Sequence, residues 1–176
     1  MSLNPYALPA TTHSYLARAA ESLSEAVAAT DVPTRYATAH VAALRAAAAL
    51  LAARARPAPA RRRPQKNAWV LLAEVAPELG EWATFFAAGA AKRAAAEAGS
   101  TRAVTERDAD DLVRDADRFL GVVEQSLGLV PHAPLGQTLA QARVIHRGGL
   151  DGPASEVPTL NPFERMFEHP VRGRAG

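Results

Sequence analysis

The segment from Thr34 to Arg56 constrains the fold more than any other part of the chain, because no glycine or proline interrupts it. It is built mainly from Ala, Leu and Arg, which are strong helix formers. Its larger side chains fall on one helical face: Tyr36, His40, Leu44, Ala47 and Leu51. We therefore predict a long core helix from Thr34 to Arg54 or Arg56, which Pro57 ends.

Four other segments carry helical patterns with recognisable ends. The expected helices cover 14–29, 67–75, a stretch that follows Pro77–Gly80 and runs to about residue 98, and 108–127. Thr105 and Asp108 have the spacing of a capping box before the last of these helices. Helices separated by short connections pack as antiparallel neighbours. The sequence thus predicts an all-α, up-and-down bundle of about five helices.

The distribution of proline and small polar residues sets the expected domain limits. Residues 14–128 are predicted to form the helical domain, with a basic, proline-rich loop at 57–66. Residues 1–13 are expected to be a flexible N-terminal tail. Residues 129–176 are expected to be a mostly disordered tail, in which a short helix over 135–145 is one alternative.

Composition excludes several classes of protein. The chain of 176 residues suits a single domain, and it contains no cysteine, which rules out disulfides, thiolate metal sites and a cysteine nucleophile. The absence of cysteine fits a cytoplasmic location. We expect no membrane partner, because no run approaches about 18 large apolar residues and the N-terminus lacks the pattern of a signal peptide.

The histidines do not form a recognisable metal site. They are scattered along the chain, at His13, His40, His132, His146 and His169. None belongs to a pair with the spacing that zinc sites or di-metal helical bundles use. A phosphate-cradling glycine loop and a nucleophile elbow are also missing from the sequence. We therefore expect neither a metal nor a cofactor.

One pair of residues could carry chemistry, namely Arg35 and His40. Metal-independent RNA cleavage needs a group that exchanges a proton near neutral pH and a cation that stabilises charge on phosphate, and these two side chains suit the two tasks. Five residues along an ideal helix place them roughly 140° apart, however. His40 also lies on the apolar face, where a lone histidine is usually a core residue. Both interpretations stay open.

Two further features could bind partners. The first is a run of cations without an intervening acid: Arg54, Arg56, Arg61, Arg62, Arg63 and Lys66. Such a run could approach a phosphate backbone, or it could be a solvated loop. The second is the pair Phe163 and Phe167, one helical turn apart, which could dock a protein partner or belong to a tail without a role.

Three segments resemble HEPN (higher eukaryotes and prokaryotes nucleotide-binding) domains, specifically a HEPN-like family common in actinobacteria. They are Arg35–Arg54, Pro77–Phe86 and Ala109–Leu120, and the resemblance covers about residues 14–128. It implies a helical bundle that is frequently a homodimer. Many members are ribonucleases whose Arg-x4–6-His motif lies in the C-terminal helices.

This chain departs from that pattern. Its Arg-x4-His pair lies in the second predicted helix, and Tyr36 stands where a polar residue often follows the Arg. The resemblance therefore implies a non-catalytic module that binds RNA, a nucleotide or a protein partner. The alternative is a metal-independent endoribonuclease that uses Arg35 and His40.

Overall fold

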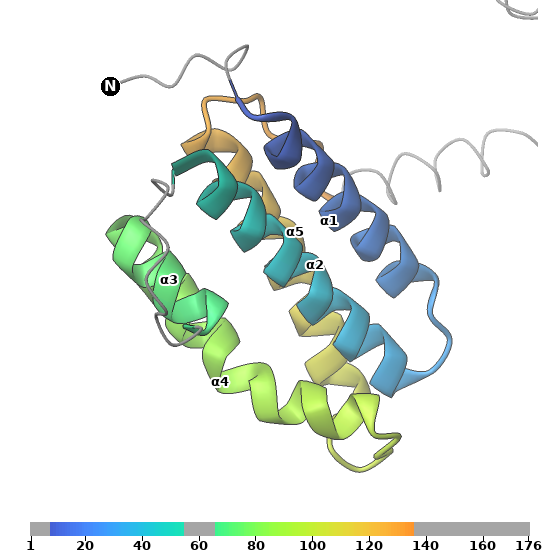
Figure 1. Cartoon of the computed structure of the whole chain (residues 1–176). Helices are drawn as coiled ribbons and strands as arrows, with labels where there is room; N and C mark the ends of the chain where they lie inside the picture. Colours follow the sequence, from blue (N-terminus) through green and yellow to red (C-terminus); the bar gives the residue numbers. More distant parts are fainter. Residues whose placement is uncertain (1–7, 55–65, 136–176) are drawn as a thin grey trace, which may run out of the picture. The chain divides into compact units, whose positions relative to one another are not determined.

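The computed structural model describes residues 8–54 and 66–135, and the secondary structure in these ranges is entirely helical. The elements are α1 (Ala10–Ala28), α2 (Val32–Arg54), α3 (Ala68–Val75), a short 3-10 helix η2 (Pro77–Leu79), α4 (Gly80–Glu97) and α5 (Glu106–Ser126). Helices α1 and α2 form an antiparallel pair, and α5 lies along both (Figure 1). The prediction of an all-α bundle is confirmed.

The start of α1 differs from the prediction. The helix begins at Ala10, immediately after Pro9, whereas we expected it at Ser14. The backbone N–H of Thr12 donates to the carbonyl of Pro9, and the Thr12 side chain is fully buried. Residues 10–13 therefore belong to the bundle and not to the expected N-terminal tail. Tertiary burial outweighs the weak helix preference of the two threonines.

Helix α2 is the central helix and contacts each of the other four. It is buried on almost every side, through Tyr36, Ala39, His40, Ala42, Ala43, Ala46, Ala47, Ala49 and Leu50. Leu44 and Leu51, which we placed on the core face, are only half-buried. Because alanine is small, neighbouring helices can pack against α2 from several directions. A prediction based only on the larger side chains therefore assigns the buried face of α2 incorrectly.

Helix α2 is also long and apolar enough to cross a membrane by length and composition, with a mean hydropathy of 1.3 in its best window. Half of that window is buried inside the bundle. A core helix of a helical bundle passes the same test, and the contacts of α2 on all sides account for its apolar composition.

Aromatic side chains fill the space between α3, α4 and α5. Phe86 is fully buried, and its ring centroid lies 5.1 Å from that of Trp69 and 5.1 Å from that of Phe119. The predicted apolar face of α5 is confirmed: Leu112, Ala116, Phe119, Leu120, Val123 and Leu127 are all buried. Phe85, next to Phe86 on α4, is 46% exposed, and Ala73 of α3 is also exposed, so neither belongs to the core.

The chain does not leave the bundle where α5 ends. Gly128 has a φ of 77°, which reverses the chain, and residues 129–135 fold back along α5. We call this segment the strap. The strap is the first part of the tail 129–176 that we expected to be mostly disordered. That expectation is wrong for the strap, because Pro131 and Pro134 suggested a loop without tertiary contacts. The described residues end at Leu135. The rest of the expected helix over 135–145, together with Phe163 and Phe167, lies outside them.

Candidate binding cleft between helices α4 and α5

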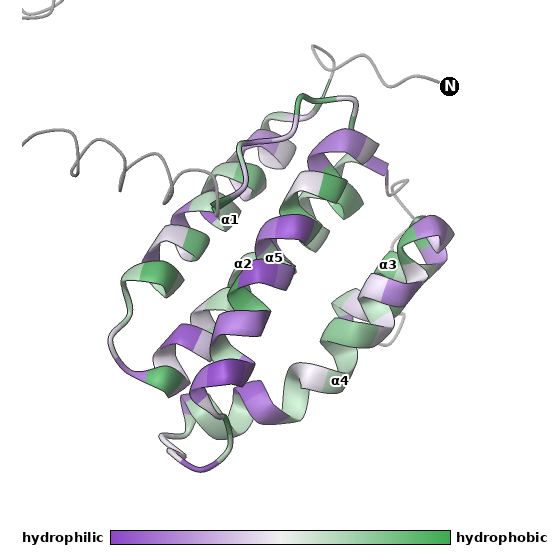
Figure 2. Ribbon diagram, turned by 180° about the vertical axis from the view of Figure 1, so that it is seen from behind, coloured by the Kyte–Doolittle hydropathy of each residue, from purple (hydrophilic) through white to green (hydrophobic). Residues whose placement is uncertain are grey.

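A cleft of about 780 Å³ opens between α4 and α5, with α2 as its floor. Tyr36 and His40 come from α2, and Phe85, Gly89 and Lys92 come from α4. The side contributed by α5 carries Asp108, Asp111, Leu112, Arg114, Asp115 and Arg118. In Figure 2 the face of α5 that is turned to the viewer is largely hydrophilic, in contrast to the face that packs on α2.

His40 lies at the floor of this cleft and is only 1% exposed. Its Nε2 lies 2.9 Å from the carbonyl oxygen of Phe86, and because a carbonyl only accepts, Nε2 carries the proton. Burial lowers the pKa of His40, so the ring is neutral near pH 7. The expectation that His40 is a core residue is confirmed, and the structure also places it at the floor of a cleft.

Arg35, near the start of α2, has two hydrogen-bond partners. Its guanidinium donates to the carbonyl of Ala29, at the end of α1, and to Asp110 of α5 at 2.6 Å. Arg35 is not among the described residues that line the cleft. Its role within the described chain is to tie α1, α2 and α5 together. The structure therefore does not bring Arg35 and His40 to one site in a single protomer.

The rim of the cleft contains three acid–base pairs. Lys92 lies 3.1 Å from Asp108, Arg118 lies 3.6 Å from Asp115, and Arg114 is paired with Asp111. With three basic and three acidic side chains among the lining residues, the cleft has no net formal charge. Burial raises the pKa of Asp115. Close to this rim, the exposed ring of Phe85 offers an apolar surface.

Two of the cations predicted to bind nucleic acid are already engaged with acids. Arg54 is paired with Glu78 and donates to the carbonyl of Ser126 at 2.9 Å, which satisfies an orphan carbonyl at the end of α5. Lys66 lies 2.6 Å from Glu74. The other four, Arg56, Arg61, Arg62 and Arg63, lie outside the described residues.

A further polar cluster was not predicted from the sequence. His132, in the strap, lies 2.8 Å from Asp117 and 2.8 Å from Glu124, both on α5. Asp117 was the available signal. It falls among the apolar positions of α5, and a buried carboxylate requires a partner.

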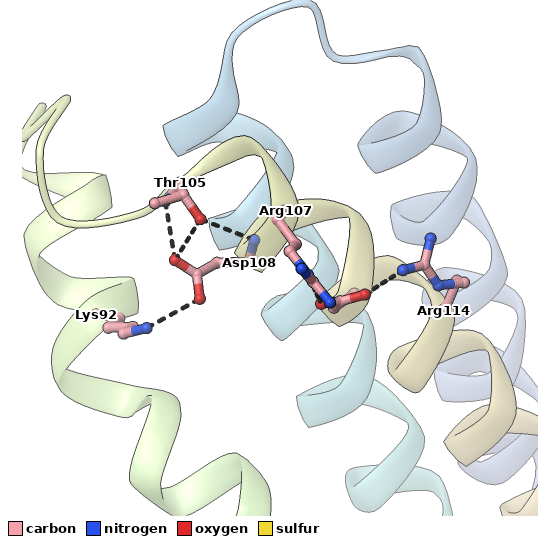
Figure 3. Close-up of polar contacts among 6 residues, drawn as sticks. Lys92, Thr105, Arg107, Asp108 and Arg114 are labelled. Atoms are coloured by element: carbon pink, nitrogen blue, oxygen red, sulfur yellow. Dashed lines mark hydrogen bonds and ion pairs between the residues drawn. The ribbon is translucent and has the colours of Figure 1, made fainter.

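The start of α5 is fixed by the predicted capping box, which is confirmed. The Thr105 hydroxyl accepts from the N–H of Asp108, and the Asp108 carboxylate accepts from the N–H of Thr105 (Figure 3). The hydrogen bonds from Thr105, followed by that from Lys92, lower the pKa of Asp108 to about 2. Through its ion pair with Lys92, Asp108 also links the α4 side of the cleft to the α5 side.

We predict that this box stabilises the fold above about pH 4 and fails in acid. The folded pKa of Asp108 is lowered from 3.8 to about 2, so the stabilisation is present above the usual value and is lost as the pH falls through the folded one. The difference in melting temperature between the wild type and Asp108→Ala should therefore shrink from pH 5 to pH 2. Glu106→Ala is the control, because Glu106 also lies in the first turn of α5 and interacts with the helix dipole but is not part of the capping box. A difference that stays constant over this range would contradict the prediction.

The fold and the cleft define a class: a small bundle of antiparallel helices with a neutral cleft on one side of its central helix. A family model described as HEPN-like matches residues 26–124, which is more than half of the chain. The protein belongs to the HEPN-like family. Neither the curated proteins nor the solved structures contain a match.

Proposed function

We propose that the chain is a non-catalytic HEPN-like domain that binds a protein partner in the cleft between α4 and α5. The observation that carries this proposal is the pairing of every basic residue on the cleft rim with an acid, beside the exposed ring of Phe85. A partly apolar surface with charged groups of both signs at its edge is typical of protein–protein interfaces.

The same pairing argues against RNA or a nucleotide as the ligand. Phosphate binding depends on cations that neutralise the ligand and release its counterions. In this cleft Lys92, Arg114 and Arg118 each have a carboxylate partner, and binding a phosphate there would leave those carboxylates beside an anion. A protein segment with charged groups of both signs can exchange these pairs without such repulsion.

The arrangement of Arg35 and His40 also favours a non-catalytic role. A histidine that acts as an acid or base must reach its substrate, whereas Nε2 of His40 donates to a main-chain carbonyl within the bundle. Arg35 would have to leave both Ala29 and Asp110 to stabilise a phosphate. The endoribonuclease alternative therefore requires rearrangement of two helix contacts.

The proposal can be tested with a photocrosslinking residue, p-benzoylphenylalanine, at position 85. The control position is Val70 on α3, which is exposed to a similar degree. In cells that naturally produce the chain, position 85 should give a protein adduct of defined mass that position 70 does not give. An RNA adduct at position 85, or equal adducts at both positions, would contradict the proposal. An adduct with a second copy would instead assign the cleft to the expected homodimer.

We further predict that Phe85→Ala weakens binding of the captured partner by about tenfold or more, as the loss of a central aromatic contact does in other interfaces. Val70→Ala should leave the affinity unchanged. In a parallel assay with purified protein, RNA cleavage should stay at background in both the wild type and the Arg35→Ala variant. Cleavage by the wild type that disappears in a folded Arg35→Ala variant would favour the endoribonuclease alternative.

A further inference from the structure

Beyond Leu129, whose N–H donates to the main-chain carbonyl of Glu124, the strap makes four hydrogen bonds to two carboxylates of α5. Glu124 Oε2 accepts from the main-chain N–H of His132 and contacts its Nδ1, each at 2.8 Å. Asp117 contacts Nε2 of His132 at 2.8 Å and accepts from the N–H of Leu135 at 3.2 Å. The strap thus crosses α5 with one histidine between two acids.

The surface of α5 is shaped to receive this ring. Gly121 lies between Asp117 and Glu124 on the same helical face, one turn from each. A Cβ atom at Gly121 would lie 3.9 Å from Cε1 of His132, so the imidazole rests directly over the glycine. The Asp117 side chain is 8% exposed and that of Glu124 is 15% exposed, which limits competition from water.

The hydrogen bonds define the protonation state that the arrangement needs. An ionised carboxylate only accepts hydrogen bonds, so each imidazole nitrogen must carry a proton to bond with its acid. A neutral imidazole has a single N–H and would place a lone pair against one of the two carboxylates. We infer that His132 is a pH-sensitive clasp, which holds the strap on α5 when its ring is doubly protonated and releases the strap when the ring loses a proton.

The electrostatics agree with this geometry. Burial alone would lower the pKa of His132, but the hydrogen bonds to Asp117 and Glu124 outweigh it, and the pKa is raised above its usual value of 6.5. Both acids come from α5. Arg54 reaches the same end of α5 from α2, but Glu78 and the carbonyl of Ser126 hold it.

The sign of the pH dependence follows. Since the folded pKa is raised, the clasp contributes fully below about 6.5, the unfolded value, and its contribution is lost as the pH rises through the folded value. Release therefore occurs above pH 6.5, as the pH rises through the folded pKa. Release of the strap would expose Asp117 to solvent. It would also detach Leu135, the last described residue of the strap, from α5. This device is separate from the α4–α5 cleft and does not depend on its partner.

The test uses the full chain with one nitroxide label. Because the sequence has no cysteine, Ala133→Cys, at an exposed position of the strap, gives a single labelling site. The electron paramagnetic resonance spectrum should change from an immobilised to a mobile form between pH 6 and pH 9. A label at Thr30→Cys, in the exposed connection between α1 and α2, should show no such step.

Two substitutions separate titration from simple loss of structure. Adding His132→Gln should abolish the pH step at position 133, whereas His13→Gln, at an exposed histidine of α1, should leave it intact. Asp117→Asn should move the pH step to lower pH. If the Asp117→Asn variant does not fold, the Glu124→Gln variant is used in its place. A label whose mobility does not respond to pH, or a step that persists in His132→Gln, would overturn the inference.

Discussion

Replacing Phe86 with alanine is expected to lower the free energy of unfolding by about 3–5 kcal/mol, the range found when a buried aromatic side chain is removed from a packed core. Phe86 has no exposed surface, and its ring contacts Trp69, Trp82 and Phe119. These partners come from three helices, so no single movement closes the cavity. Equilibrium unfolding in urea, followed by far-ultraviolet circular dichroism, measures the change.

Phe85→Ala is the matched control, because the two phenylalanines are neighbours on the same helix. The side chain of Phe85 is 46% exposed, and its removal leaves no enclosed cavity. We expect a loss of about 1 kcal/mol or less. Comparable losses for the two variants would show that Phe86 does not hold the core together in the way described.

The second large effect is expected at Gly89, where α4 packs tightly against Tyr36 and His40 of α2. A Cβ atom at this position would lie 3.0 Å from the hydroxyl oxygen of Tyr36 and 3.4 Å from Cδ2 of His40. Gly89→Leu must therefore push α4 away from α2 or displace two buried rings. Overpacking of this kind costs about 1–3 kcal/mol, and we expect the upper end, because both neighbours are buried. Thermal unfolding and urea unfolding should agree on the loss.

Two alanine substitutions serve as controls for Gly89→Leu. Gly89→Ala should be close to neutral, because the Tyr36 hydroxyl lies at the end of a movable side chain and alanine favours the helix by about 0.5–1 kcal/mol over glycine. Gly80→Ala has open space around the new methyl group and a helical backbone, so it should be stabilising. If Gly89→Leu is no worse than Gly89→Ala, the contact between α4 and α2 is looser than described.

From α3 onward, the helix ends were the part of the fold that could be predicted best. Asn67 caps α3, Thr105 and Asp108 cap α5, and Gly99 and Gly128 follow α4 and α5 with positive φ. These signals are local, since each depends on hydrogen bonds within one turn. The buried face of α2 was predicted less well. Its burial depends on which neighbours surround an alanine-rich helix, and no spacing within the helix encodes that.

The candidate cleft was only partly visible in the sequence. His40 could be identified as a residue of interest, because it is a lone histidine on an apolar helical face. The pair formed by Lys92 and Asp108 could not be predicted, since these residues come from different helices. The His132 cluster was missed for a similar reason. Its two acids are separated by two helical turns, and the strap reaches them only because Gly128 reverses the chain.

The buried alanines of α2 limit which substitutions the sequence can tolerate. Alanine richness can arise from biased coding alone, but Ala39, Ala43 and Ala46 have no exposed surface and lie in the core between packed helices. A larger residue at any of these positions would require a whole helix to move. Substitutions should therefore accumulate on the outer face of α5 and leave α2 almost unchanged. The small size of these alanines is therefore a requirement of the helix packing.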